Sequence, residues 1–175
     1  MSAAPWSVRR VHVVDDAQVA GLADVLIDCV EGGASVSFML PLSRERAAAF
    51  WRSVASEVRA GERALIVAED ATGLCGTVQL ILGQPENQPH RADLAKMLVH
   101  RRARRQGLGA ALMRAAEATA RACGKTLLVL DTANPEAERL YARMGWTRVG
   151  EVPGYALLPQ GGLCSTTFYY RDLAD

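Results

Sequence analysis

The chain has 175 residues, of which 50% are hydrophobic, and its formal net charge is +1. This length and composition fit one globular domain with a sizeable core, so we expect a single domain over residues 1–175. The balanced charge argues against a nucleic-acid-binding protein, and no run approaches the roughly 20 apolar residues of a membrane span. Residues 1–14 lack the apolar centre of a signal peptide, and we expect a cytoplasmic protein.

The cysteines favour a reduced, intracellular chain, because they are widely spaced and form no Cys-x-x-Cys pair. No histidine lies near them at the spacing that metal ligands need, and we expect no metal site. Buried thiols are the simplest interpretation of the four positions, which are Cys29, Cys75, Cys123 and Cys164.

The first half of the chain combines strand signals with two capped helical segments. Aspartate or serine before a helix can accept its free N–H groups, and glycine after it can end the helix. The expected elements are a strand over 6–14, a helix between Asp15 or Asp16 and Gly32, an apolar connection over 34–42, a helix between Ser43 and Gly61, and paired strands over 63–69 and 74–82.

The second half also alternates strands and helices, which predicts an α/β domain with one mixed sheet and helices on both faces. The expected elements are a strand over 91–100, a helix from Leu108 to Gly124, a strand over 126–131, a helix with Pro135 in its first turn, a strand over 148–152, a loop over 153–162 and a strand over 163–171. The longer helix is expected to bury one face, formed by Leu108, Ala111, Leu112, Ala115, Thr119 and Ala122.

The segment over 94–109 changes from a strand to a basic loop and then to a helix N-terminus. The first turn of a helix offers free N–H groups and partial positive charge, glycine lets an anion approach the backbone, and arginine suits phosphate. We interpret the segment as a pyrophosphate-binding loop. The alternative is a tight turn beside a solvated cluster of arginines, namely Arg101, Arg102, Arg104 and Arg105.

Two common nucleotide-binding motifs fit this loop less well. A P-loop needs Lys-Ser or Lys-Thr after its last glycine, and neither follows Gly109. A Rossmann fingerprint needs a third glycine, but Leu112 and Met113 occupy that part of the helix. Asp131 lies where a ribose-binding carboxylate could be, which leaves a dinucleotide site open as an alternative.

Two motifs resemble signatures of the GNAT family of N-acetyltransferases. The loop over 104–109, RRQGLG, is similar to the family's Q/R-x-x-G-x-G/A segment, and residues 134–146, NPEAERLYARMGW, resemble N-x-x-A-x-x-L-Y-x-x-x-G-F/W. The resemblance implies a single GNAT-like domain whose mixed, mostly antiparallel sheet splays between its fourth and fifth strands. It also implies an acyltransferase that uses acetyl-CoA as its cosubstrate.

By this resemblance, the pantetheine arm of acetyl-CoA would lie between the strands that end near Val99 and Asp131. Free backbone groups beside it would pair with its amides, and N–H groups over 106–110 would hold the pyrophosphate. The implied cosubstrate-binding residues are Leu98, Val99, Arg104, Arg105, Gln106, Gly107, Leu108, Gly109, Ala110 and Asn134, with Arg101 as a further candidate for phosphate contact.

Acetyl transfer to an amine needs a base, an oxyanion donor, here a backbone N–H near Val99, and a proton for the departing thiolate. Tyr141 matches the motif's tyrosine, and a phenol of pKa about 10 stays protonated beside a thiol of about 8.5. Asp93 and Asp131 are the candidates for the base, whereas His100 is less suited because arginines adjoin it. A core tyrosine and two strand-end carboxylates are the structural alternatives.

Segments over 32–39, 91–93, 130–132 and 147–155 resemble the tabtoxin-resistance acetyltransferases of this family. That resemblance implies a small, amino-acid-like acceptor such as a β-lactam toxin, direct transfer in a ternary complex, and a role in antibiotic resistance. It links Asp131 to the acceptor amine, and the shorter Asp93 less directly. Ser35, Phe38 and Tyr155 are candidates for the acceptor pocket, with loop and core packing as the alternatives.

Two other functions remain open at this point. The same chemistry could act on a protein or peptide amine, and an acyl-CoA-binding regulator could lack catalysis altogether. The apolar segment over 36–42 fits a pocket wall or a contact with a second copy of the chain.

Overall fold

The structure is a computed structural model that describes residues 5–174. Residues 1–4, which belong to the segment expected to lack a signal peptide, and residue 175 lie outside the described part. The elements are β1 (Trp6–Val11), α1 (Asp16–Glu31), α2 (Arg44–Ala60), β2 (Arg63–Asp70), β3 (Gly73–Ile81), β4 (Arg91–Val99), the 3₁₀ turn η1 (Arg101–Ala103), α3 (Leu108–Ala122), β5 (Leu127–Thr132), α4 (Pro135–Arg143), β6 (Thr147–Leu157) and β7 (Leu163–Asp172).

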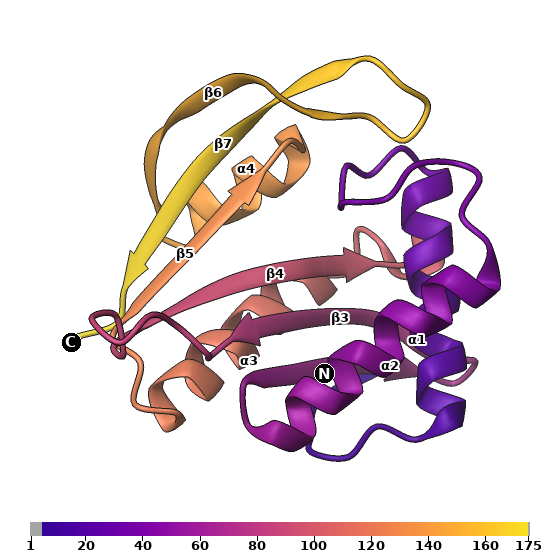
Figure 1. Ribbon diagram of the computed structural model, residues 1–175, viewed down its shortest axis with the longest axis horizontal. Helices are drawn as coiled ribbons and strands as arrows, with labels where there is room; N and C mark the ends of the chain where they lie inside the picture. The colour runs from indigo at the N-terminus through magenta and orange to yellow at the C-terminus, as the bar shows by residue number, and fades with distance from the viewer. Residues whose placement is uncertain (1–4, 175) are drawn as a thin grey trace.

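A single seven-stranded sheet runs in the order β1-β2-β3-β4-β5-β7-β6. Neighbouring strands are antiparallel except β4 and β5, which are parallel and pair only from Arg91–Leu127 to Asp93–Val129. Beyond this register the two strands diverge, and the sheet opens like a V between them (Figure 1). The expected splay between the fourth and fifth strands is therefore confirmed.

A β-bulge in β4 lies at the start of this opening. Thr77 pairs with Leu98 and Gln79 with Ala95, so two residues of β4 oppose the single residue Val78 of β3. One of the two, Lys96, has a φ of 50°, which is uncommon for a residue with a side chain. Beyond the bulge β4 rejoins the ladder with β3 at Leu98 and Val99, so the irregularity is confined to the residues beside the opening.

Helices cover both faces of the sheet, as expected (Figure 1). On one face Leu22 and Trp51 of α1 and α2 pack over Leu65 of β2. On the other face Leu112 of α3 packs over Ile66, and α4 lies on this same side beside β5 and β7. Each such fully buried side chain contributes about 1.5–3 kcal/mol, so both layers hold the split sheet in place.

The helix ends follow the capping chemistry expected from the sequence. Asp15, not Asp16, caps α1 and forms a capping box with Gln18. The Ser43 hydroxyl accepts a hydrogen bond from the Arg46 N–H at 3.2 Å at the start of α2. None of the helices in the described part of the chain is long and apolar enough to cross a membrane.

The expected buried face of α3 is only partly right. Thr119 is half-buried and Ala122 exposed, whereas the buried residues are Leu108, Leu112, Met113, Ala116, Glu117 and Ala120. Alanines occur on every side of this helix, so the hydrophobic periodicity of its sequence does not indicate clearly which face is buried. The buried Glu117 carboxylate is satisfied by the Trp146 indole N–H at 3.0 Å, a long-range contact that the pattern does not reveal.

The expected loop over 153–162 is wrong in its first half. β6 continues to Leu157 with an irregular register between Val152 and Ala156, and this irregularity absorbs Pro153 and Gly154. Because β6 is the edge strand, a proline without an N–H removes no obligatory ladder bond. β1 ends at Val11, earlier than expected.

Candidate active site

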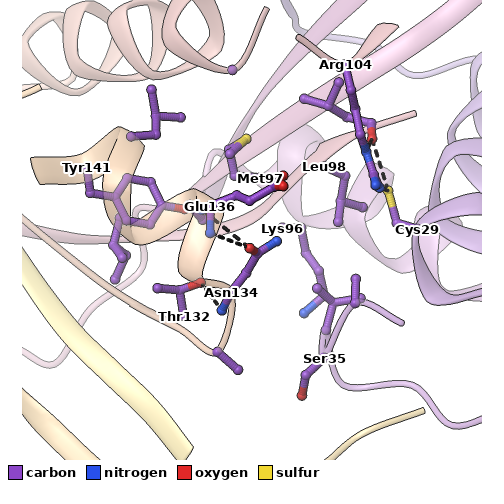
Figure 2. A pocket seen from close by; sticks show the side chains of 18 of the residues that line it. Cys29, Ser35, Lys96, Met97, Leu98, Arg104, Thr132, Asn134, Glu136 and Tyr141 are labelled. Carbon is purple, nitrogen blue, oxygen red and sulfur yellow. Dashed lines mark hydrogen bonds between the residues drawn. The ribbon is translucent and has the colours of Figure 1, made fainter. Parts of the chain in front are cut away.

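The opening between β4 and β5 contains a cavity of about 720 Å³ (Figure 2). Its walls come from the loop after α1, the bulged half of β4, the start of α3, the end of β5 and the start of α4. These elements are far apart in sequence and meet only because the sheet splits.

One end of the cavity is the N-terminus of α3, which is built to receive an anion. Gly107 occupies the N-cap with a φ of 79° and no side chain caps the helix. The first helical hydrogen bond runs from the Ala111 N–H to the Gly107 carbonyl at 3.2 Å, so the N–H groups of 108–110 precede the helical ladder, and these residues border the cavity. The anion-binding interpretation of this loop agrees with this geometry.

Gly109 borders the cavity and also has a packing role. A Cβ at this position would lie 3.1 Å from Cδ2 of Leu140 on α4. The absence of a side chain at Gly109 therefore lets α3 and α4 approach each other closely at the cavity wall. The left-handed conformation of Gly107 sets the direction in which α3 begins.

The basic cluster divides into two pairs. Arg101 donates to the Asp28 carboxylate at 2.8 Å, and Arg102 bonds Asp70 at 3.1 Å and does not border the cavity. Arg104 and Arg105 do border it. The structure thus engages Arg101 in an ion pair rather than leaving it free for phosphate, and two arginines remain at the anion end.

The side chains of Gln106 and Asn134 form hydrogen bonds to the backbone around the cavity. The Gln106 side chain donates to the Arg102 carbonyl at 3.2 Å and does not border the cavity. The Asn134 carboxamide oxygen accepts from the Glu136 N–H at 2.8 Å and caps α4 at the cavity edge (Figure 2). Asn134 therefore positions α4, which explains why an asparagine precedes the proline at the helix start.

The end of β4 presents one residue's backbone to the opening. The His100 N–H donates to the Cys75 carbonyl at 2.9 Å. In an antiparallel ladder, the backbone groups of successive residues point alternately toward and away from the neighbouring strand. The backbone groups of Leu98 therefore point toward β3, and those of Val99 point toward the opening. The Val99 carbonyl indeed accepts from Nε of Arg104 at 3.0 Å. Free backbone groups were expected on Leu98 and Val99. Leu98 faces β3 instead, and at Val99 the N–H faces the opening while the carbonyl already accepts from Arg104.

Tyr141 lies on α4 at the wall of the same cavity, with its ring 4% exposed (Figure 2). The ring packs on Tyr169 at 5.8 Å and on Trp146 at 5.9 Å between centroids. Burial raises the pKa of Tyr141 well above that of a free phenol, and the charge of Asp131 raises it further. The hydroxyl therefore keeps its proton at any physiological pH, as a proton donor to sulfur must.

A second, smaller cavity of about 350 Å³ adjoins the first. All three residues expected at the acceptor pocket, Ser35, Phe38 and Tyr155, border it together with Asp131. The Asp131 carboxylate accepts a 2.6 Å hydrogen bond from the Thr166 hydroxyl, which fixes its orientation. Asp131 borders both cavities and thus stands where they join.

Asp93 borders neither cavity. It lies where β4 still pairs with β5, below the opening, and its carboxylate bonds Arg91 and, at 3.2 Å, the Gln84 side chain. Of the two carboxylates that the sequence offered as candidates for the base, only Asp131, the favoured one, borders the cavities. Strand position decides between them, since the sheet has not yet split at Asp93.

Sequence reasoning missed Lys96, which borders the larger cavity beside the bulge (Figure 2). Its ammonium donates to the Ser37 hydroxyl at 3.1 Å. The available signal was a lysine between the apolar residues of a strand, which periodicity alone assigns to a solvated face.

A sheet split around a cavity, with a free helix N-terminus at one end and a smaller cavity beside it, suits a transferase that takes a phosphate-bearing substrate. The model of the acetyltransferase (GNAT) family matches residues 34–146. The chain belongs to this family, as its two motifs indicated.

The comparisons with individual proteins agree. The chain is 31% identical over 127 residues to an uncharacterized N-acetyltransferase in the hisH-hisA intergenic region of Azospirillum brasilense, which covers 71% of this chain and 74% of that protein. The yncA structure from Salmonella typhimurium, solved with its cofactor acetyl-CoA, has a TM-score of 0.79 at 19% identity and covers 98% of this chain and 95% of that one. Ribosomal-protein-alanine N-acetyltransferase from Brucella melitensis has a TM-score of 0.80 at 19% identity, with coverages of 95% and 99%. The two structures share this fold.

Proposed function

We propose that the protein transfers the acetyl group of acetyl-CoA to the amine of a small, amino-acid-like molecule, directly and within a ternary complex. The observation that supports this best is the wall shared by the two cavities, since Ser35, Ser37 and residues 131–133 border both. The smaller cavity has the size of a small-molecule pocket. Donor and acceptor would therefore meet at Asp131.

The larger cavity fits the cosubstrate in both shape and chemistry. Its anion end offers the α3 N-terminus with Arg104 and Arg105, which suits a pyrophosphate. Beyond Asp93 the edge of β4 no longer pairs with β5 and borders the cavity, which suits an extended arm with amide groups. Acetyl-CoA carries both features, and bound there it would supply the thioester.

Three groups of the chain would then perform the transfer. Asp131 would take a proton from the acceptor's ammonium, directly or through a water molecule. The amine nitrogen would form a bond to the acetyl carbon as the carbon–sulfur bond breaks, with the Val99 N–H stabilising the developing oxyanion. Tyr141 would give its proton to the departing sulfur, and the second proton that the acylated nitrogen sheds would reprotonate Tyr141 through water. Asp93 would act at most indirectly, through its contacts below the opening.

We further propose an amino-acid-like β-lactam toxin as the first acceptor to test, which would make the protein a cytoplasmic antibiotic-resistance enzyme. The support is the resemblance of four segments to the tabtoxin-resistance acetyltransferases, three of which supply walls of the smaller cavity. Phe38 comes from the first of these segments and Tyr155 from the last.

The test is mass-spectrometric detection of acetyl transfer to tabtoxinine-β-lactam, beside amino acids, polyamines, aminoglycosides and short peptides. A gain of one acetyl group on the toxin would support both the chemistry and the acceptor. Modification of another small amine would refute the toxin assignment only. Transfer to peptides alone would favour a protein N-acetyltransferase, and acetyl-CoA binding without any transfer would favour a regulator.

A further inference from the structure

The Lys96 side chain is held in one place by the bulge and its neighbours. Its backbone adopts a φ of 50°, and its Nζ lies 3.1 Å from the Ser37 hydroxyl and 5.7 Å from the centroid of the Phe50 ring. The contacts come from the loop after α1 and from α2, on the side of the sheet where the smaller cavity opens. Ser37 borders both cavities.

This ammonium has no anionic partner within residues 5–174, because none of the ion pairs found there includes it. Burial lowers the pKa of Lys96, the Arg63 guanidinium lowers it further, and the Asp131 carboxylate opposes both. A partly desolvated charge is costly without a partner. A bound anion would remove that cost, and the cavity gives such an anion access.

The phosphates of the cosubstrate are poorly placed to be this anion. Their donors, the α3 N-terminus with Arg104 and Arg105, follow the end of β4, whereas Lys96 lies at the bulge before it. Ser37, the hydrogen-bond partner of Lys96, also lines the acceptor cavity. An anion bound at Lys96 would therefore belong to the acceptor.

We propose that Lys96 binds a carboxylate of the acceptor, while Asp131 receives the acceptor's amine at the junction of the cavities. This rests on the proposed function and narrows it to amines that carry a free carboxylate. Opposite charges at the two ends of the acceptor would fix which end faces the thioester, since a reversed molecule would set like charges together.

The test compares each of the common L-amino acids with its own carboxamide, with wild-type protein and with Lys96→Met, which keeps an unbranched stem without the charge. For any acid that is acetylated, wild type should prefer it to its amide by about 10- to 100-fold in kcat/KM. Lys96→Met should lose most of this preference through a higher KM for the acid, with the KM for acetyl-CoA unchanged. Lys96→Arg should keep part of it.

Lys125→Met is the matched control, because Lys125 donates to the Leu82 and Pro89 carbonyls away from both cavities. It should retain the acid preference. Equal turnover of acids and amides by wild type would overturn the assignment and leave the proposed function intact, and this comparison needs no variant to fold. An equal loss on acids and amides in Lys96→Met would also overturn it. Absence of transfer to every amine tried would refute the proposed function, and this inference with it.

Discussion

Replacement of Tyr141 by phenylalanine should lower kcat without loosening the fold. The Tyr141 ring is buried against Tyr169 and Trp146, and phenylalanine keeps those contacts. No hydrogen bond of the hydroxyl is found within residues 5–174, so its removal leaves no partner unsatisfied there. We expect the free energy of unfolding to stay within about 0.5 kcal/mol of wild type.

The catalytic effect should be much larger than the structural one. A positioned proton donor contributes about 10²- to 10⁴-fold, and a 10²-fold loss corresponds to about 2.7 kcal/mol of transition-state stabilisation. Because the pKa of Tyr141 is raised by burial, the wild-type hydroxyl stays protonated, and its titration should not limit kcat below about pH 10. The assay is release of the CoA thiol at saturating acceptor, with acetyl-CoA affinity measured separately by calorimetry.

Tyr169→Phe provides the matched control. This neighbouring tyrosine is also 4% exposed, but its hydroxyl donates to the Glu138 carboxylate at 2.7 Å and it does not border either cavity. Its loss should cost about 1–2 kcal/mol of stability and leave kcat within about threefold of wild type. An unchanged kcat in Tyr141→Phe, or an equal fall of kcat in both variants, would refute the proton-donor role.

Three further outcomes follow from the geometry. Asp131→Asn should lower kcat by at least about 10²-fold, while Asp93→Asn should change kcat little. If steady-state kinetics showed the larger loss of kcat in Asp93→Asn, Asp93 and not Asp131 would be the base. Gly107→Ala and Gly124→Ala both place alanine at a positive φ with open space around it. Each variant should therefore lose about 1–2 kcal/mol of its free energy of unfolding in a denaturant titration, but only Gly107→Ala should weaken acetyl-CoA binding. Burial raises the pKa of Asp28, yet hydrogen bonds from a neighbouring arginine outweigh it and the net pKa is lowered. The stabilisation that Asp28 contributes is therefore present above about pH 4 and is lost as pH falls through its lowered pKa. In thermal melts, the Tm of Asp28→Asn should fall less with acid than the Tm of wild type. An equal fall of Tm in both proteins would contradict this.

Local chemistry explains why most elements could be predicted from the sequence. A capping aspartate, a capping serine and a proline in a first helical turn act within a few residues, and each was found where its side chain indicated. The extent of β6 could not be predicted in this way. Pro153 and Gly154 are turn residues in most contexts, and only their position on an edge strand makes them tolerable there.

The bulge in β4 illustrates a second limit. Nothing local favours a positive φ at Lys96, because a residue with a Cβ rarely adopts the left-handed region. The conformation is imposed by the ladder with β3, whose register skips one residue between Thr77 and Gln79. Pairing of distant segments thus decides the feature that places Lys96 beside Ser37, a residue that borders both cavities.

The arginine run shows why a charged cluster in sequence is not yet a binding surface. Arg101 and Arg102 are held by Asp28 and Asp70, carboxylates 73 and 32 positions away in the chain. These pairs attach the 3₁₀ turn to α1 and to the end of β2. The loop that follows the turn therefore lies at the opening between β4 and β5. Two arginines of the run therefore position the loop, and only the other two are available to an anion. Lys96 is the reverse case: it stands between apolar residues of β4, yet the fold places it at the larger cavity with its ammonium bonded to Ser37.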